Sequence, residues 1–576
     1  MTYSEAFDKQ APTLSKYEDN AFLIWATGLY LDEPNLDDLA NEALTDGPND
    51  KKIDLIKLDT EQRKIILAQG YYSSRKIDSA PENKASDLLI AATWLLTGEL
   101  AQIPPKLKNI IRECRDALKS QEIDQIDLLY IHNLPESKNI RKTLEVIQND
   151  VNARIATPEK DIVVIAKELG SNSIEELFIS RHSAIAVKGE IVCPAKIYFR
   201  EVGPNWEAAI VSLPGSWLHE LYQSKGDSLY SANYRGFLGA SKKKKINSNI
   251  LNTAEKEPEN FWAYNNGITI LTLAYEEGVD ESNNPVTKLD GISIINGAQT
   301  SGSIGNLDNK KHNLEKIRVL GRIIKCNDLE ITGSIIRYNN TQNQITSWDR
   351  YSNDTTQKNI ANEFRLFGFD YSLKRGFESS DSGLSIQSVA QAILAFRGNH
   401  LDANAGKNKI FDNEQLYKSV FDQTKARHIL LAFSMNQAIN QVRSNLRSIP
   451  SSKLLPIQEK QSSLFSYLKF KFFLLAVIGN SMPTLTGKRT EKNEVAICPA
   501  FARDNTIELI IKEMIPAVSL VLAHLTTYFD GKDVYNELNS SKTAAVASAQ
   551  VAAIIQSIID VGSIDSPPLA KAVCQS

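Results

Sequence analysis

Residues 46–72 read DGPNDKKIDLIKLDTEQRKIILAQGYY, and this stretch decides the fold of the N-terminal part of the chain. It holds two runs rich in β-branched residues, IDLIKLD and RKIILAQGYY, joined by the short polar turn TEQ. Such a pattern predicts two antiparallel strands. Asp54 lies at the start of the first run and Gln69 lies near the end of the second. We therefore expect both side chains to face the same pocket.

The segments that follow this hairpin alternate between helical and strand patterns. A long helical region, 83–120, is broken at two prolines, and IDLLYIHN and DIVVIAKEL are strands on either side of a further helix. This alternation predicts an α/β domain over residues 1–170. Residues 171–350 carry more strand signals and predict a mixed α/β core, whereas residues 351–576 are mostly helical. The expected fold class is therefore a multidomain mixture of α/β and α+β units.

Composition limits the classes of function. The 576 residues are 42% hydrophobic and 23% charged, with a net charge of −4, so nucleic-acid contact must depend on a local patch. The five cysteines are odd in number and lack paired spacing, which argues against a disulfide framework or a zinc site and fits a reducing compartment.

We expect a cytoplasmic protein with no membrane partner. The first residues, MTYSEAFDKQ, lack the basic and apolar regions of a signal peptide. The most apolar segment, 464–479, is too short to span a bilayer, and the segment 509–525 is interrupted by charges and a proline. Both segments are therefore predicted to be buried core helices.

The hairpin at 46–72 resembles the catalytic hairpin of the restriction-endonuclease-like, or PD-(D/E)XK, fold. In that fold one strand begins with an acidic residue, and the next carries an acid or Gln one position short of a Lys. The resemblance implies a Mg²⁺ site with Asp54 as metal ligand, supported as catalytic residues by Gln69, Asp50 and Glu42. Tyr71 stands where the lysine would be, which makes the motif degenerate. A β-hairpin with a surface Asp remains the alternative.

Three Asn-rich clusters form a second candidate site. FWAYNNGITIL at 261–271, DGISIINGAQTSGSIG at 290–305 and IIRYNNTQNQI at 335–345 are strand-like runs that each meet such a cluster. A helix that opens after Gly297 would present backbone N–H groups to an anion. The amides suit a phosphate or a base edge, and we expect the three clusters to converge on one pocket. Turns satisfied by their own side chains are the alternative.

The predicted nucleic-acid-binding or nucleotide-binding residues come from these clusters and from one upstream arginine. A lysine run at 242–245 is a further candidate for phosphate contact. The residues are Arg235, Asn265, Asn266, Gly267, Asn296, Gly297, Gln299, Thr300, Arg337, Asn340 and Gln342.

Four segments in order, NYRGFLG at 233–239 and the three Asn-rich runs, resemble the AIPR family, named for abortive infection and phage resistance. The upstream segments AFLIWATGLYL and TDGPNDKKIDLI look like the nuclease-like domain that often precedes the AIPR core. The core is also similar in layout to the DGQHR and ParB-like group, although Gln299-Thr300 stand where that group has His-Arg.

These resemblances imply a bacterial anti-phage defence protein that engages nucleic acid. One hypothesis is a Mg²⁺-dependent nuclease. The alternative is a non-catalytic nucleotide-binding or DNA-binding sensor or regulatory module with an inactive nuclease fold. Two modes of assembly stay open, a homo-oligomer and a complex with a partner protein of the defence system.

Overall fold

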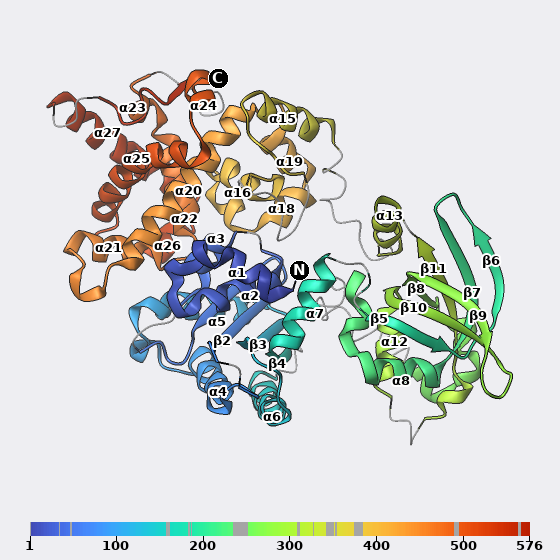
Figure 1. The fold of residues 1–576 in the computed structure, drawn as a ribbon. Coiled ribbons are helices and arrows are strands. Elements are labelled where there is room, and N and C mark those ends of the chain that lie inside the picture. The colour runs from blue at the N-terminus through green and yellow to red at the C-terminus, as the bar shows by residue number, and fades with distance from the viewer. Residues whose placement is uncertain are drawn as a thin grey trace.

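The chain folds into three units: an N-terminal α/β sandwich, a central sheet unit and a C-terminal helical region (Figure 1). The α/β unit lies against the helical region, and the sheet unit stands to one side of both (Figure 1). The computed structural model describes residues 2–33, 35–45, 49–75, 77–156, 162–182, 185, 187–233, 252–307, 312–326, 328–340, 351, 354–373, 384–488, 495–562 and 566–575.

The N-terminal unit is built on a four-stranded sheet in the order β1-β2-β3-β4. Strands β1 and β2 are antiparallel, which confirms the predicted hairpin, and β2, β3 and β4 run parallel. Helices cover both faces, which is why β2 and β3 are buried almost throughout. The strands are β1 (Leu55–Asp59), β2 (Lys64–Tyr71), β3 (Gln125–His132) and β4 (Val163–Leu169).

The two faces of this sheet carry separate cores. One, here the α4 face, packs against α4 (Glu82–Leu96), α5 (Pro105–Lys119) and α6 (Lys138–Ile155). The other, here the α2 face, packs against α1 (Tyr3–Leu14), α2 (Ala21–Leu31), α3 (Leu36–Ala43) and α7 (Ser171–His182). In α7, Phe178 packs near Trp25 of α2, so the core of the N-terminal unit includes a helix that follows residue 170.

The central unit is a seven-stranded sheet in the order β5-β10-β8-β11-β7-β6, with β9 paired to β10. All described pairings are antiparallel except β8 with β11. The strands are β5 (Val187–Cys193), β6 (Ile197–Val202), β7 (Trp206–Pro214), β8 (Ile268–Thr272), β9 (Ala274–Val279), β10 (Pro285–Asn296) and β11 (Arg318–Cys326).

Helices cover the two faces of the central sheet unequally. The main core packs one face against α8 (Gly215–Lys225), η3 (Gly226–Asn233), α11 (Phe261–Tyr264) and α12 (Ala298–Gly305). On the opposite face, α13 (Leu329–Asn340) packs Ile335 and Ile336 against a smaller apolar cluster. Short 3-10 turns, η5 (Pro258–Asn260) and η6 (Leu314–Lys316), connect these elements.

The segment IIRYNN was predicted to be a strand that ends in a polar cluster, and this prediction is wrong. It forms the last half of α13. Asp328 starts the helix, since its carboxylate accepts a hydrogen bond from the N–H of Ile331 at 3.0 Å. The apolar residues then recur at helical spacing, which places Ile335 and Ile336 on the sheet.

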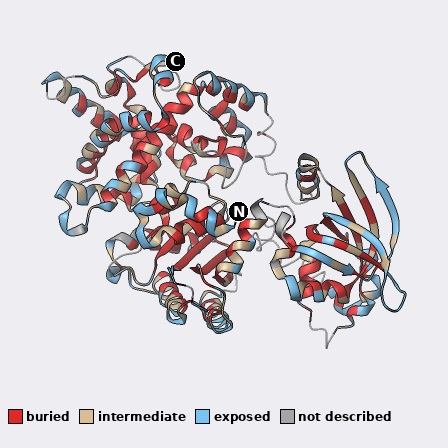
Figure 2. Ribbon diagram, viewed as in Figure 1, coloured by how far each residue is buried: buried red, intermediate tan, exposed pale blue. Residues whose placement is uncertain are grey.

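The C-terminal region is helical, as predicted, with one large core (Figure 2). Helix α16 buries Ile386, Val389, Ile393 and Phe396. The helices are α15 (Thr355–Leu366), α16 (Ile386–Phe396), α17 (His400–Asn404), α18 (Lys407–Asp412), α19 (Glu414–Phe421), α20 (Ala426–Ser448), α21 (Pro456–Phe465), α22 (Phe470–Asn480), α23 (Met482–Thr486), α24 (Pro499–Asp504), α25 (Ile507–Tyr528), α26 (Val534–Leu538) and α27 (Thr543–Asp560).

The most apolar helices of this region contribute to its core. The segment 464–479 is divided between α21 and α22, which are bent by 108° to each other. Within the described residues, α25 and α27 are long and apolar enough to cross a membrane by length and composition. Both helices pack against α22, and each contributes buried side chains to the shared core.

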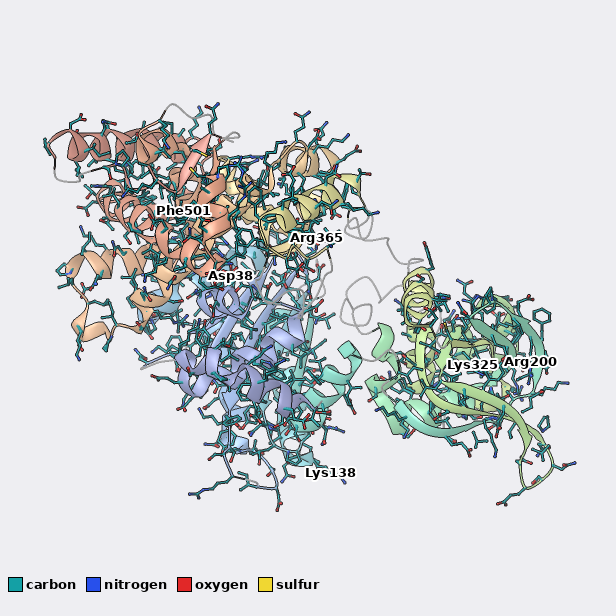
Figure 3. The ribbon with its side chains drawn as sticks, turned by 45° about the horizontal axis from the view of Figure 1, so that its top comes forward. Asp38, Lys138, Arg200, Lys325, Arg365 and Phe501 are labelled. Carbon is teal, nitrogen blue, oxygen red and sulfur yellow. The ribbon has the colours of Figure 1, made fainter. Side chains whose placement is uncertain are left out.

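Charged groups join the N-terminal unit to the helical region. Asp38 lies at this junction (Figure 3) and forms an ion pair with Lys471 at 2.7 Å. Lys407 pairs with Glu33 at 3.2 Å. Arg447 donates to the backbone carbonyls of Ala40 and Leu44 at the end of α3. The two units are therefore held together by specific polar contacts.

Glu42 makes this junction sensitive to pH. Burial alone would raise its pKa, but Lys57 and Lys471 outweigh that effect and lower the pKa of Glu42 to about 2. An unfolded glutamate titrates near pH ~4.3. The stabilisation is therefore complete above that pH and is lost as the pH falls toward the folded value. Because a third of the side chain is exposed, water screens part of the effect.

We expect Glu42→Gln to lower the melting temperature by a few degrees at neutral pH. The difference from wild type should stay constant down to about pH 5 and shrink below about pH 4, where the unfolded carboxylate becomes protonated. Thermal melts of both proteins across this range provide the measurement. Glu414→Gln is the matched control, since Glu414 forms an exposed surface pair with Lys418. A difference that is unchanged at pH 3 would contradict this assignment.

Candidate functional site

The predicted pair Asp54 and Gln69 meets on the α4 face of the N-terminal sheet. The Nε2 atom of Gln69 donates to Asp54 Oδ1 at 3.0 Å and to the Lys52 carbonyl at 2.6 Å. The second carboxylate oxygen of Asp54 accepts from the N–H of Gly70 at 2.8 Å. Both residues are buried, with 7% and 1% of their surface exposed. The hairpin therefore brings the two side chains together as expected.

The contacts of this pair do not fit a Mg²⁺ centre. Both partners of Gln69 Nε2 are oxygen acceptors, which fixes the amide with its NH₂ group toward Asp54. A cation shared by the two side chains would need the amide oxygen there instead. Among the described residues, no group of three or more His, Cys, Asp or Glu side chains could hold a metal ion.

The other predicted catalytic residues are used elsewhere. Asp50 accepts from the N–H of Lys52 at 2.9 Å and shapes the loop before β1. Glu42 pairs with Lys57 at 3.1 Å, and Lys57 lies on the α2 face, opposite Asp54. The structure therefore does not bring Glu42 to the Asp54 pair.

No lysine takes the place that Tyr71 occupies beside Gln69 in the described residues. Tyr71 itself packs against the core of the α4 face. Lys64 is buried at the other end of β2, 3.5 Å from Asp127. Lys52 pairs with Asp87 of α4 at 3.4 Å, a contact that the sequence did not suggest. Lys52 and Lys64 thus form structural pairs.

We expect Asp54→Asn to destabilise the protein by about 2 kcal/mol, because the amide cannot accept both buried hydrogen bonds. This loss should be the same in EDTA and in Mg²⁺. Urea denaturation in both buffers measures it, with Asp78→Asn as the control, since Asp78 is exposed. A magnesium-dependent gain in stability for wild type, absent in Asp54→Asn, would instead establish a metal site.

The Asn-rich segments around 265 and 296 converge with the end of α13 in the central unit. The hydroxyl of Thr300 donates to Asn265 Oδ1 at 3.2 Å. The Nδ2 atom of Asn296 donates to the Asn339 carbonyl at 2.7 Å. Segments that are separated by more than forty residues thus meet at one edge of the sheet. This place is here called the Asn-rich site, and it consists of Asn265, Asn296, Gly297, Thr300, Arg322 and Asn339.

Two glycines allow this close approach. Gly267 and Gly297 have φ values of +84° and +85°, a region that favours glycine. A Cβ atom on Gly297 would lie 2.7 Å from the Gly267 carbonyl oxygen, and one on Gly267 would lie 2.5 Å from that of Leu320. The ends of β10, β8 and β11 therefore meet backbone to backbone.

The side chain of Asn265 stabilises the turn in which it lies. Asn265 Oδ1 accepts from the N–H of Gly267 at 3.1 Å, which is an Asx turn. By contrast, Asn266 is exposed and Gln299 is half-buried. No described residue accepts from the first N–H groups of α12, and Gly297 supplies no side-chain cap. The turn interpretation accounts for Asn265, while the first N–H groups of α12 have no acceptor in the part of the chain that the structure describes.

Arg322 of β11 is the site residue that sequence reasoning missed. It lies opposite Thr269 in the parallel β8–β11 ladder and donates to the Thr269 hydroxyl at 3.1 Å. It also donates to Asn339 Oδ1, while Asn339 Nδ2 bonds the Ile335 carbonyl at 2.8 Å. No carboxylate in the described part of the chain pairs with Arg322, and partial burial lowers its pKa. Its positive charge is therefore held in place and has no neutralising carboxylate within the described residues.

Several predicted residues cannot be placed at the site. Arg235, Gln342 and the lysine run at 242–245 lie outside the described residues. Arg337 and Asn340 are described only as backbone of α13. Tyr230 of η3 approaches the site, because its buried hydroxyl lies 3.0 Å from Ser301 Oγ in α12.

Exposed aromatic side chains adjoin the Asn-rich site in sequence. Trp262 and Tyr264 of α11 are 41% and 63% exposed, and Tyr338 of α13 is 66% exposed. Tyr264 directly precedes Asn265, and Tyr338 directly precedes Asn339. The Tyr264 hydroxyl bonds the Glu257 carboxylate at 3.3 Å. Exposed aromatic residues thus directly precede two asparagines of the site in the sequence.

Comparison with protein families gives a match over the central and C-terminal parts of the chain. The model of the AIPR protein family matches residues 230–559, more than half of the chain. The chain belongs to the AIPR family. Membership points to abortive-infection defence against phage. The AIPR match includes the whole Asn-rich site and most of the helical region, while Asp54 and Gln69 lie outside it. No curated protein and no solved structure matches this AIPR chain.

Proposed function

We propose that this AIPR protein acts in phage defence by binding nucleic acid at the Asn-rich site. The observation that carries the proposal is Arg322, a guanidinium fixed by Thr269 and Asn339 with no carboxylate paired to it among the described residues. An arginine held in this way is suited to a phosphate, because charge-assisted hydrogen bonds to a phosphate are strong and geometrically specific. Phosphate contacts of this kind fix the register of a bound strand.

The opening of α12 supports the same ligand chemistry. Its first N–H groups find no acceptor among the described residues, and the helix dipole favours a negative group there. Thr300, in the first turn of α12, donates to Asn265. Arg322 donates to Asn339, which also bonds Asn296 at the end of β10. Backbone N–H groups and a guanidinium at one edge can bind adjacent oxygens of a polyanion.

The neighbouring aromatics support a single-stranded ligand. Trp262, Tyr264 and Tyr338 offer exposed ring faces, and unpaired bases stack on such faces with about 1–3 kcal/mol per base. In a duplex the base faces are already stacked on each other, so these rings would add little. We therefore propose single-stranded DNA or RNA as the ligand, with bases on the rings and phosphates at Arg322.

In this proposal the N-terminal unit is an inactive nuclease-like module. The hydrogen bond between Gln69 and Asp54 supports that role, since it satisfies the carboxylate without a metal. The unit docks on the helical region through ion pairs such as Asp38 with Lys471. It therefore provides a scaffold beside the binding unit, and the Mg²⁺-dependent nuclease is the less supported alternative.

The test of this proposal compares single-stranded and duplex oligonucleotides by fluorescence anisotropy. We expect wild type to bind the single strand more tightly, and Tyr264→Ala to weaken that binding about tenfold, as loss of one stacked base predicts. The matched control is Tyr198→Ala on β6, where the tyrosine is equally exposed at 63%. Equal weakening by both variants, or no binding of any oligonucleotide, would overturn the proposal.

A further inference from the structure

The last described strand of the chain lies against the helical region and brings two cysteines together. Strand β13 (Val573–Gln575) pairs antiparallel with β12 (Val495–Ile497), so that Cys574 lies opposite Ala496. The N–H of Cys498 continues the ladder by donating to the Ala572 carbonyl at 2.9 Å. Because side chains alternate along a strand, Cys498 and Cys574 point to the same face. The two thiols are close enough for Cys574 to raise the pKa of Cys498.

Two basic residues surround this pair. Arg427 donates to the Ile497 carbonyl at 2.6 Å, and the same Nη1 atom lies 4.0 Å from Cys574 Sγ. Lys488 donates to the carbonyls of Ala570 and Val573, both at 2.9 Å. The Arg427 guanidinium therefore lies beside the Cys574 sulfur. Burial, and then the contact with Cys574, raise the pKa of Cys498 to about 11, so Cys498 stays protonated.

The other cysteines lack this arrangement. Cys114 and Cys193 are buried, and burial raises the pKa of each thiol. Cys326 is partly exposed, and its thiol faces the Asp328 carbonyl at 3.5 Å. Cys498 and Cys574 are both partly exposed. They thus combine access from solvent with a neighbouring thiol.

We propose that Cys498 and Cys574 form an oxidisable dithiol, which hydrogen peroxide converts to a disulfide between β12 and β13. The sulfur of Cys574 attacks one peroxide oxygen, the O–O bond breaks, and the leaving hydroxide takes the proton of the Cys574 thiol to become water. The resulting sulfenic acid is attacked by the sulfur of Cys498, whose proton leaves with the sulfenic oxygen as a second water. Each sulfur loses one electron, and the peroxide is reduced to two waters.

The disulfide would fasten the C-terminal strand to the core of the helical region. It closes a loop of more than seventy residues, from 498 to 574. Closing a long loop restricts the unfolded chain, so the oxidised protein should melt at a higher temperature than the reduced one. This dithiol is independent of the Asn-rich site and does not depend on the proposed nucleic-acid binding.

Peptide mapping of the full-length protein under non-reducing conditions tests the proposal. After mild peroxide treatment we expect a linked peptide pair containing Cys498 and Cys574, and a rise in melting temperature of several degrees that dithiothreitol reverses. Cys326→Ser should retain both effects and Cys574→Ser should lose both. If wild type yields no linked pair, or links Cys574 to a different cysteine, the proposal is wrong whatever the variants do.

Discussion

Gly297→Ala is expected to destabilise the central unit by about 3 kcal/mol. Alanine at the observed φ of +85° costs about 1–2 kcal/mol of backbone strain. The new methyl group would also lie 2.7 Å from the Gly267 carbonyl and 3.0 Å from Ile268 Cα, both of them backbone atoms. Overpacking of this kind costs about 1–3 kcal/mol. The two costs arise at the same place and should largely add.

Urea denaturation of Gly297→Ala, compared with Gly333→Ala, measures this effect. Gly333 lies within α13, and an added Cβ there meets no other atom within 4 Å. The control should be unchanged or more stable by about 0.5–1 kcal/mol, since alanine favours a helix. Wild-type stability in Gly297→Ala would mean that β10 and β8 do not approach each other as closely as the structure has them.

The hairpin at the N-terminus was predictable because its signals are local. A short polar turn between two β-rich runs leaves few other pairings, and Asp54 and Gln69 fall on one face as a result. The place of Glu42 was not predictable from sequence, because it depends on which face of β1 the helix α3 covers. Apolar residues of β1 pack on both faces of the sheet, so the sequence of the strand does not show which face α3 covers.

The third Asn-rich run shows how local composition can mislead. IIRYNN contains β-branched residues that suit a strand, but the same residues also recur at helical spacing from Asp328 onward. The cap at Asp328 and the apolar contacts of Ile335 and Ile336 with the sheet decide between the two. The sequence nonetheless predicted that these segments meet. The end of α13 brings Asn339 to Asn296, where the end of the expected strand would have lain.

Arg322 could not be found from the sequence. Its partner Thr269 is 53 residues away, and they meet only because β8 and β11 run parallel as neighbours. Alternation along β11 places Arg318 and Arg322 on one face, so the sequence offers two equal candidates for the arginine of the site. Only the pairing of β11 with β8, which depends on residues far apart in the sequence, places Arg322 beside Thr269.

Arg322→Gln is expected to weaken binding of single-stranded nucleic acid at least tenfold. A hydrogen bond to a charged group contributes about 1.5–3 kcal/mol, which corresponds to roughly a ten- to hundredfold change in affinity. Glutamine can still reach a hydroxyl or an amide but carries no charge, so the salt dependence of binding should also decrease. Folding should change little, because the Arg322 side chain is exposed.

Binding of nucleic acid at the Asn-rich site depends on this guanidinium. Anisotropy titrations of wild type, Arg322→Gln and Arg318→Gln with one labelled single-stranded oligonucleotide measure that dependence. Arg318 is the matched control, since it is exposed on the same face of β11 and its replacement removes the same charge. We expect a loss of tenfold or more for Arg322→Gln and near wild-type affinity for Arg318→Gln. Equal affinities for the two variants would show that Arg322 is not the residue that binds the phosphate.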